Sequence, residues 1–155
     1  MASRFTYPTP IGPLCITEED GFITHIDLPE TLPFTDEREE ETPLIQEAHH
    51  QLTEYFRGER RTFDLPLHPR GTDFQQRVWQ ALRAIPYGET RSYKQIAKAV
   101  GCPKGVRAVG GANNRNTLLI VIPCHRIIGA DGRLVGFAAG IERKEFLLRL
   151  EGSIL

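Results

Sequence analysis

The chain has 155 residues, a formal net charge of −1 and 40% hydrophobic residues, which is ordinary for a soluble globular protein and unlike disordered, collagenous or coiled-coil chains. Its length fits one large domain or two small ones. No run approaches the roughly 18 uncharged apolar residues that a membrane span needs, and the first ten residues lack the apolar core of a secretory signal. We therefore expect a cytoplasmic protein that does not associate with membranes.

The charges are distributed unevenly along the chain. Residues 1–70 hold six basic and fourteen acidic side chains, a net of −8, whereas residues 71–155 hold thirteen basic and six acidic ones, a net of +7. Such an imbalance favours contact between the second segment and an anion such as nucleic acid. Attraction between the two segments would produce the same imbalance, so the charge count leaves both interpretations open.

The cysteines are Cys15, Cys102 and Cys124, and no two of them form a CxxC pair. This number and spacing argue against a disulfide framework and against a zinc knuckle, and free thiols fit a reducing compartment. We expect no bound metal. A free cysteine can still be a nucleophile, so thiol chemistry remains open.

The first segment alternates short runs of strand-forming residues with turns. We predict strands over 4–7, 14–17 and 22–28, because these runs are rich in β-formers and are separated by proline-rich and Asp-Gly turns. Thr42-Pro43 predicts the start of a helix with an apolar stripe, which Gly58 ends. The other expectations are a solvated acidic loop over 29–43, ordinary surface or rim positions for His49 and His50, a last strand over 63–67 and a linker over 68–71.

The second segment is predicted to be mostly helical. Thr72 and Ser92 each precede an amphipathic run and are typical helix N-caps. A third helical run, 106–113, follows the second across a tight turn that contains Gly105. Two short helices joined by such a turn indicate a helix-turn-helix. A final helix is expected over about 142–150. The predicted domains are 1–68, of α/β class, and 72–155, mainly α.

The run 107–113, the candidate recognition helix, contains Gly110 and Gly111. Each glycine costs a helix roughly 1 kcal/mol relative to alanine, so their presence needs a reason. A thin face of glycine and alanine would fit the DNA minor groove, which is about 6 Å wide. Arg107, at the helix start, could then reach into the base stack. The alternative is close packing between helices, with Arg107 as a surface charge.

Cys124 follows an apolar run and is itself followed by His125 and Arg126. A thiolate is the reactive form of cysteine, and nearby cationic groups favour it. A histidine can take the thiol proton directly or through a water, and a carboxylate would orient the imidazole. The alternative is an inert buried cysteine, which is common after an apolar run.

The second segment carries specific motifs: FQQRVW at 74–79, IPYGET at 85–90, Ser92-Tyr93, RAVG at 107–110, Asn116, IPCHRIIG at 122–129 and LLRLEG at 147–152. Their order and spacing over about residues 72–152 resemble those of the O6-alkylguanine-DNA alkyltransferases, also called methylated-DNA–protein-cysteine methyltransferases. The match is less sharp in the first segment, at 9–14. The resemblance implies a ribonuclease-H-like α/β N-terminal domain and a mainly α C-terminal domain with a winged helix-turn-helix.

The resemblance also implies the activity. An alkyl group would pass irreversibly, once per molecule and without a cofactor, from O6-alkylguanine in DNA to Cys124, with O4-alkylthymine as a further substrate. His125 would be the base of Cys124, acting through a water, and Glu151 would hold His125. The protein would act as a monomer on double-stranded DNA, bound through the minor groove, after flipping the damaged nucleotide out of the duplex.

Further roles carry over residue by residue from the resemblance. Tyr93 would donate to the guanine ring, Asn116 would tie the helix-turn-helix to the active-site loop, and Arg107 would fill the gap left by the extruded base. The carbonyls of Cys124 and Ile127 would accept from the guanine amino group, and the amide of Ala138 would support the O6 atom. The residues expected to contact substrate or DNA are Ser92, Arg107, Ala108, Gly110, Arg126, Ile127, Phe137 and Ala138.

Two other classes of function remain open at this point. One is a non-catalytic DNA-binding module that senses lesions, although relatives of that type have tryptophan in place of the cysteine. The other is a Cys-His hydrolase such as a peptidase, which would need a substrate cleft and an oxyanion hole and would not explain a basic helix-turn-helix.

Overall fold

The computed structural model describes residues 2–29, 38–137 and 139–154, which form two compact units. Unit 1 comprises Met1–Pro69 together with Thr117–Leu119, and unit 2 comprises Arg70–Asn116 and Ile120–Leu155. The units are therefore not two uninterrupted segments, since three residues from the second half of the chain belong to the first unit.

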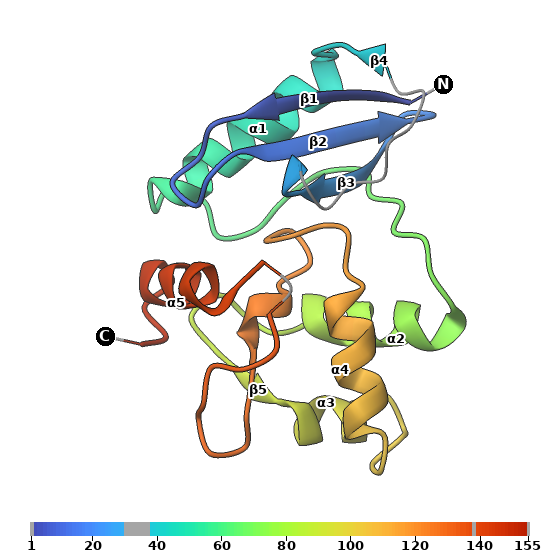
Figure 1. Ribbon diagram of the computed structural model, residues 1–155, viewed down its shortest axis with the longest axis vertical. Coiled ribbons are helices and arrows are strands. Elements are labelled where there is room, and N and C mark those ends of the chain that lie inside the picture. The colour runs from blue at the N-terminus through green and yellow to red at the C-terminus, as the bar shows by residue number, and fades with distance from the viewer. Residues whose placement is uncertain (1, 30–37, 138, 155) are drawn as a thin grey trace. The chain divides into compact units, whose positions relative to one another are not determined.

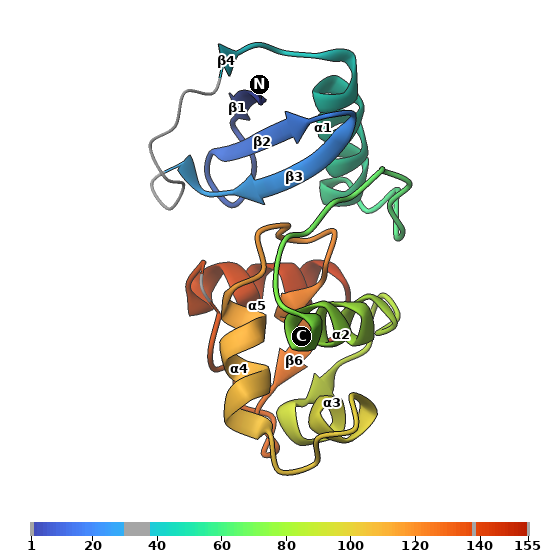
Figure 2. The same ribbon diagram turned by 90° about the vertical axis from the view of Figure 1, so that its right-hand side faces the viewer.

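Unit 1 is a small sheet covered by one helix. Strands β1 (Ser3–Tyr7), β2 (Leu14–Glu19) and β3 (Phe22–Asp27) form an antiparallel meander, and the two-residue strand β4 (Arg38–Glu39) pairs with β1 in parallel, giving the order β3-β2-β1-β4. Helix α1 (Pro43–Phe56) lies along one face of the sheet (Figures 1 and 2). The Thr42 side chain caps α1 by accepting from the Ile45 amide. The three predicted strands and the helix are confirmed.

Two expectations for unit 1 need correction. The acidic segment 29–43 includes β4, and residues 30–37 lie outside the described part of the chain. The segment 63–67 is not a strand, because the Gln51 amide takes up both backbone groups of Asp64, at 2.9 and 3.0 Å, and Pro66 has no N–H to offer a ladder. Leu67 alone forms a bridge, with Ile23.

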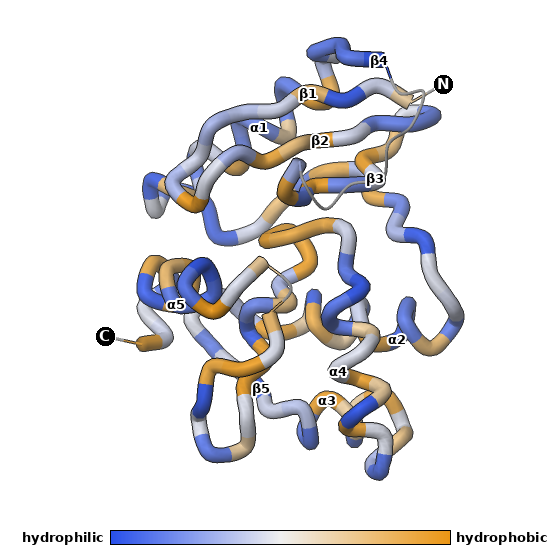
Figure 3. The backbone as a smooth tube through the Cα atoms, viewed as in Figure 1, coloured by the Kyte–Doolittle hydropathy of each residue, from blue (hydrophilic) through white to orange (hydrophobic). Residues whose placement is uncertain are grey.

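The apolar run 118–122, seen as a continuous hydrophobic stretch of the tube in Figure 3, is divided between the units. Its first part extends the exposed edge of β3: the Ile26 amide donates to the Thr117 carbonyl at 2.8 Å, and the Leu119 amide donates to the Ile26 carbonyl at 2.9 Å. Covering an edge strand in this way removes a site for unwanted strand pairing. Its second part is buried in unit 2 and leads directly to Cys124.

Unit 2 is a set of short helices with a two-stranded parallel pair. Its elements are α2 (Asp73–Arg83), β5 (Arg91–Ser92), α3 (Tyr93–Ala99), α4 (Val106–Asn114), a 3-10 turn (Cys124–Arg126), β6 (Ile127–Ile128) and α5 (Ile141–Leu150). Thr72 and Ser92 both form complete capping boxes with a glutamine three residues later. Helices α3 and α4 form the predicted helix-turn-helix, and the Trp79 indole ties α2 to α4 by donating to the Ala112 carbonyl at 2.8 Å.

The predicted fold class, a small α/β unit followed by a mainly helical one, is thus confirmed. No helix within the described ranges is long and apolar enough to cross a membrane.

Candidate active site

Cys124 lies in a tight turn that several local features hold in place. The 3-10 turn follows Pro123, and it is closed by the Cys124 amide donating to the Ile122 carbonyl at 2.7 Å and the Arg126 amide donating to the Pro123 carbonyl at 3.0 Å. Strand β6 follows at once and pairs with β5, which leads into α3. The backbone on both sides of Cys124 is therefore fixed. Cys124 is only 2% exposed, so a base stacked inside a duplex could not reach its sulfur.

His125 and Glu151 form a fully buried pair across 25 intervening residues. His125 Nε2 lies 2.8 Å from Glu151 Oε2, and neither side chain is exposed. Because an ionised carboxylate can only accept, Nε2 carries the hydrogen and Nδ1 is left as the basic nitrogen. His125 Nδ1 is buried and has no hydrogen-bond partner among the described residues. This arrangement leaves a proton acceptor on the residue next to Cys124.

Arg126 completes the same cluster and does not face solvent. Its Nε and Nη2 atoms donate to Glu151 Oε1 and Oε2 at 2.9 and 3.0 Å, and its Nη1 donates to the Ile85 carbonyl at 2.7 Å. The guanidinium also lies over the Tyr87 ring, and the residue is 6% exposed. This placement gives Arg126 an internal role in the cluster and leaves no free side-chain nitrogen for the expected contact with substrate or DNA. A bidentate ion pair in a buried site uses up the donors that a phosphate would need.

The pKa values in this cluster follow from burial and from the neighbouring charges. Burial alone would raise the pKa of Glu151, but the hydrogen bonds and positive charges of His125 and Arg126 outweigh it and lower the pKa to about 2. Burial lowers the pKa of His125 below its ordinary 6.5, and Glu151 offsets only part of that effect. The carboxylate is therefore ionised and the imidazole neutral near pH 7, which is the state a proton acceptor requires.

Lys144 is a buried residue of this site that the sequence reasoning missed. Its Nζ donates to the carbonyl of Ile127 and, at 2.8 Å, to that of Val135. Burial lowers its pKa to about 8, and attraction to Cys124 acts in the opposite direction. The same attraction stabilises a thiolate. Helical spacing could have found it, because Lys144 falls on the apolar stripe of α5 with Leu147 and Leu148, and the same spacing leads to Glu151 at the C-cap of the helix.

Tyr93 and Asn113 converge on the backbone of residues 135–136. The Tyr93 hydroxyl donates to the carbonyls of Val135 and Gly136 at 3.0 and 3.3 Å, and Asn113 Nδ2 lies 3.4 Å from the Gly136 carbonyl. Burial raises the pKa of Tyr93, and the charge of Cys124 adds to this effect, so the phenol and the sulfur lie within electrostatic reach. Gly136 has a φ of +67° and a Cβ there would lie 2.4 Å from the Tyr93 hydroxyl, so only glycine fits.

The glycines on the exposed face of α4 are not required by packing against another helix. A Cβ at Gly111 would meet nothing within 4 Å, and one at Gly110 would make only ordinary contact with the Tyr93 ring, at 3.7 Å. Arg107 and Ala108 are exposed on the same helix. Close packing between helices, the alternative raised from the sequence, therefore does not explain these glycines.

The remaining expected residues lie as follows. Asn116 follows α4, and its Nδ2 donates to the Ile122 carbonyl at 2.9 Å, just before the Cys124 turn. The Ser92 hydroxyl caps α3 by accepting from the Gln95 amide at 3.1 Å. Ile127 and Phe137 are buried, and the Ile127 carbonyl already accepts from Lys144. Ala138 lies outside the described residues.

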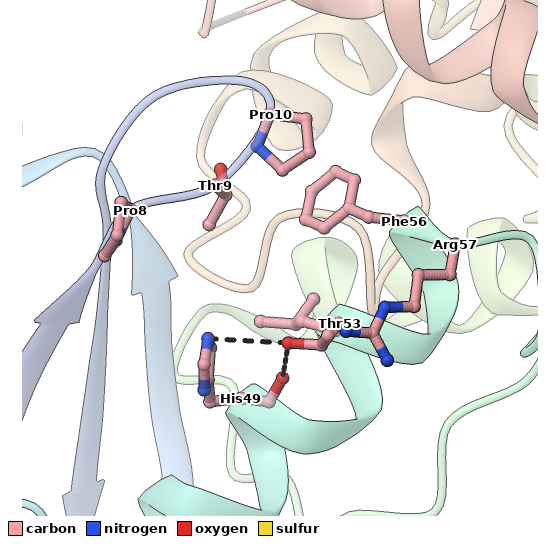
Figure 4. A pocket seen from close by; sticks show the side chains of 8 residues that line it. Pro8, Thr9, Pro10, His49, Thr53, Phe56 and Arg57 are labelled. Atoms are coloured by element: carbon pink, nitrogen blue, oxygen red, sulfur yellow. Dashed lines mark hydrogen bonds between the residues drawn. The ribbon is translucent and has the colours of Figure 1, made fainter.

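A cavity of unit 1 has no comparable chemistry. It has a volume of about 230 Å³ and lies between the 8–10 loop and α1, with His49, Thr53 and Arg57 among its lining residues (Figure 4). His49 is half-buried and stacks on Tyr7 with ring centroids 3.7 Å apart, and His50 is exposed, so the two occupy the expected rim and surface positions. Among residues 2–29, 38–137 and 139–154, no group of three or more His, Cys, Asp or Glu side chains is placed to hold a metal ion.

Comparison with known proteins shows that both units match domains of the same protein family. Residues 4–69 match the family model "6-O-methylguanine DNA methyltransferase, ribonuclease-like domain", and residues 73–153 match "6-O-methylguanine DNA methyltransferase, DNA binding domain". Two similar relatives are both named methylated-DNA–protein-cysteine methyltransferase. The Bacillus subtilis protein, termed constitutive, is 54% identical over 94% of this chain and 93% of its own, and the Methanosarcina acetivorans protein is 49% identical over 95% and 96%.

Solved structures agree with the sequence matches. The crystal structure of the Mycobacterium tuberculosis O6-methylguanine methyltransferase superposes with a TM-score of 0.91 at 46% identity, covering 99% of this chain and 94% of that one. A structure of the same organism's OGT in complex with DNA also gives 0.91, at 47% identity and covering 97% and 93%.

Proposed function

Since this chain belongs to the 6-O-methylguanine DNA methyltransferase family, we propose that Cys124 is the acceptor of the alkyl group and that the surrounding cluster activates it. The activity itself, repair of DNA by transfer of an alkyl group to a cysteine, is that of a methylated-DNA–protein-cysteine methyltransferase. The observation that carries the assignment to Cys124 is the buried His125–Glu151 pair directly beside it.

The proposed reaction is a single displacement. The Cys124 thiol gives its proton to His125 Nδ1 through a water, and Glu151 stabilises the imidazolium that forms. The sulfur then attacks the alkyl carbon as the bond between that carbon and O6 breaks, and the electron pair of that bond leaves with guanine. Lys144 favours the thiolate, while the Ala138 amide and Tyr93 donate to the base as negative charge develops on it, the Tyr93 hydroxyl exchanging its hydrogen bonds to the Val135 and Gly136 carbonyls for one to the base. The product is a stable thioether, so each molecule acts once.

Access of the base to Cys124 requires the nucleotide to leave the duplex, which costs a few kcal/mol. We propose that α4 enters the minor groove, where its thin face at Gly110 and Gly111 fits, and that Arg107 fills the gap in the stack. Double-stranded DNA carrying O6-alkylguanine is the proposed main substrate, O4-alkylthymine a further one, and the protein acts as a monomer in the cytoplasm.

Intact-protein mass spectrometry tests the proposed function. After reaction with a duplex that contains one O6-methylguanine, the protein should gain one methyl group in place of the thiol hydrogen, and peptide mapping should locate it on Cys124. The yield should not exceed one methyl group per molecule. Binding of the duplex without a change in mass would support a lesion-sensing module instead.

The lowered pKa of His125 predicts the acid limb of the rate profile. His125 is the proton acceptor only when neutral, and a pKa below 6.5 keeps it neutral as the pH falls through that value. The single-turnover rate of methyl transfer should therefore stay constant as the pH falls from 7.5 to about 6.5 and decrease only at lower pH. Circular dichroism at each pH checks that the protein remains folded. A decrease centred on pH 6.5 would contradict the proposed environment of His125.

Arg107→Ala tests the proposed extrusion of the base. The variant should repair O6-methylguanine in duplex DNA roughly tenfold more slowly, because the extruded state loses a partner, while its reaction with the free modified base should be unchanged. Arg83→Ala, which removes an exposed arginine from the end of α2, is the matched control and should affect neither reaction. Equal losses on duplex and free base in Arg107→Ala would argue against a role in extrusion.

A further inference from the structure

Asn113 on α4 has a buried hydrogen-bond acceptor that nothing in the reaction described above uses. The residue is 2% exposed, and its Oδ1 atom has no hydrogen-bond partner among the described residues. Buried polar atoms in native structures are almost always paired, and an unpaired one is unfavourable. The acceptor therefore lacks a donor among the described residues, and a donor from a ligand would satisfy it.

The neighbouring backbone fixes which end of the Asn113 amide is unpaired. The Gly136 carbonyl lies 3.4 Å from Nδ2, and a carbonyl can only accept a hydrogen bond. Turning the amide over would place two oxygens against each other, so the NH2 group faces Gly136 and the oxygen faces away from it. The available atom is thus an acceptor, and its ligand must be a donor.

The position of Asn113 links this acceptor to the reacting sulfur. Tyr93 donates to the same Gly136 carbonyl, and the charge of Cys124 acts on the Tyr93 phenol. Gly110, one turn before Asn113 on α4, faces the Tyr93 ring. Asn113 and Tyr93 therefore meet at the same backbone carbonyl, and Tyr93 lies within electrostatic reach of the sulfur that receives the alkyl group.

We propose that Asn113 Oδ1 accepts a hydrogen bond from the 2-amino group of the extruded O6-alkylguanine, which makes Asn113 a specificity-determining residue. This inference rests on the proposed function. An O6-alkylated guanine has no hydrogen on N1, so the 2-amino group is the only donor on the pairing edge of the base. The Ile127 carbonyl, expected to accept from this group, already accepts from Lys144 and has one lone pair left, so Asn113 Oδ1 would act beside it as a further acceptor.

The proposal predicts that the protein distinguishes substrates by the presence or absence of the 2-amino group. O6-methylhypoxanthine has the same methyl group and ring as O6-methylguanine but lacks the 2-amino group, and O4-methylthymine has no donor on its pairing edge. A site built to hydrogen-bond a substrate group discriminates against an analogue without it, because the protein atom is then left unpaired. Asn113 should therefore favour guanine lesions over both analogues.

Single-turnover rates on two otherwise identical duplexes test the role of Asn113. The rate ratio of O6-methylguanine to O6-methylhypoxanthine should exceed one in the wild type and should fall about tenfold in Asn113→Leu, which keeps the size of the side chain but removes the acceptor. The rate on O4-methylthymine relative to O6-methylguanine should rise in the same variant. Asn114→Leu makes the same change at the exposed neighbouring position and should leave both ratios unchanged.

The possible outcomes distinguish failure of the proposed role of Asn113 from failure of the proposed function. An unchanged ratio in Asn113→Leu, or equal rates of the wild type on the two purines, would overturn the role of Asn113 while leaving alkyl transfer intact. Equal wild-type rates would overturn the role of Asn113 even if the variant does not fold, whereas a wild-type preference is assigned to Asn113 by its decrease in the variant. Absence of methyl transfer from either duplex would overturn the proposed function, and the inference with it.

Discussion

Replacing Cys124 by serine should nearly abolish repair, with a loss of roughly 10⁶ in the single-turnover rate, the size of effect found when the nucleophile of a serine protease is removed. The hydroxyl of serine stays protonated beside a neutral imidazole of lowered pKa, and its oxygen is a poor nucleophile in that form. The measurement is transfer of a radiolabelled methyl group from duplex DNA to protein.

A control separates this chemical loss from a general effect of removing a thiol. Cys102→Ser changes a half-buried cysteine in the turn between α3 and α4 and should react at close to the wild-type rate. The Cys124→Ser variant should still bind the damaged duplex, because α4 is untouched. Repair by Cys124→Ser at the wild-type rate, or several methyl groups removed per wild-type molecule, would show that the acceptor has been misassigned.

Glu151→Gln should produce the second large effect, a loss of both stability and the rate of methyl transfer. Arg126 and Glu151 are buried together, and removal of one charge from such a pair leaves the other uncompensated, at a cost of about 3–5 kcal/mol. The glutamine amide can also present its NH2 group to His125 Nε2, which favours the wrong tautomer, so methyl transfer should slow by roughly 10²–10⁴. Urea unfolding and single-turnover kinetics measure the two effects.

Glu145→Gln is the matched control. Glu145 lies on α5 and pairs with Arg149, but both side chains are substantially exposed, and such a surface pair contributes well under about 1 kcal/mol. The control should be nearly as stable and as active as the wild type. Similar losses in the two variants would mean that the buried cluster has no special role.

The pH dependence of stability provides an independent check on Glu151. Its pKa is about 2 in the folded protein and 4.5 in the reference state, so the unfolded chain binds more protons between these values. The stability that Glu151 contributes is therefore fully present above pH 4.5 and is lost as the pH falls toward 2. The difference in unfolding free energy between wild type and Glu151→Gln should shrink over that interval, and a difference independent of pH would contradict the ion pair.

Local patterns in the sequence were enough to predict most elements of the fold. Thr42, Thr72 and Ser92 sit at helix starts because a side-chain oxygen there satisfies a free backbone amide, and this effect needs only the next three residues. The strands likewise follow from short runs and turns. The failed strand at 63–67 shows the limit, since the Gln51 side chain, twelve or more residues away, takes the backbone groups that a ladder would have used.

The sequence alone determined the order of the elements and the motif around Cys124. It also indicated the pairing of His125 with Glu151, through a resemblance of motifs rather than through spacing. Only the tertiary structure decided which charged groups are buried. It showed that Arg126, expected to contact substrate or DNA, is an internal partner of Glu151, and it placed Lys144 on the Ile127 carbonyl and Asn113 against the Gly136 carbonyl. The physical reason is that burial and pairing depend on elements that meet only after packing, whereas capping and periodicity act within a few residues.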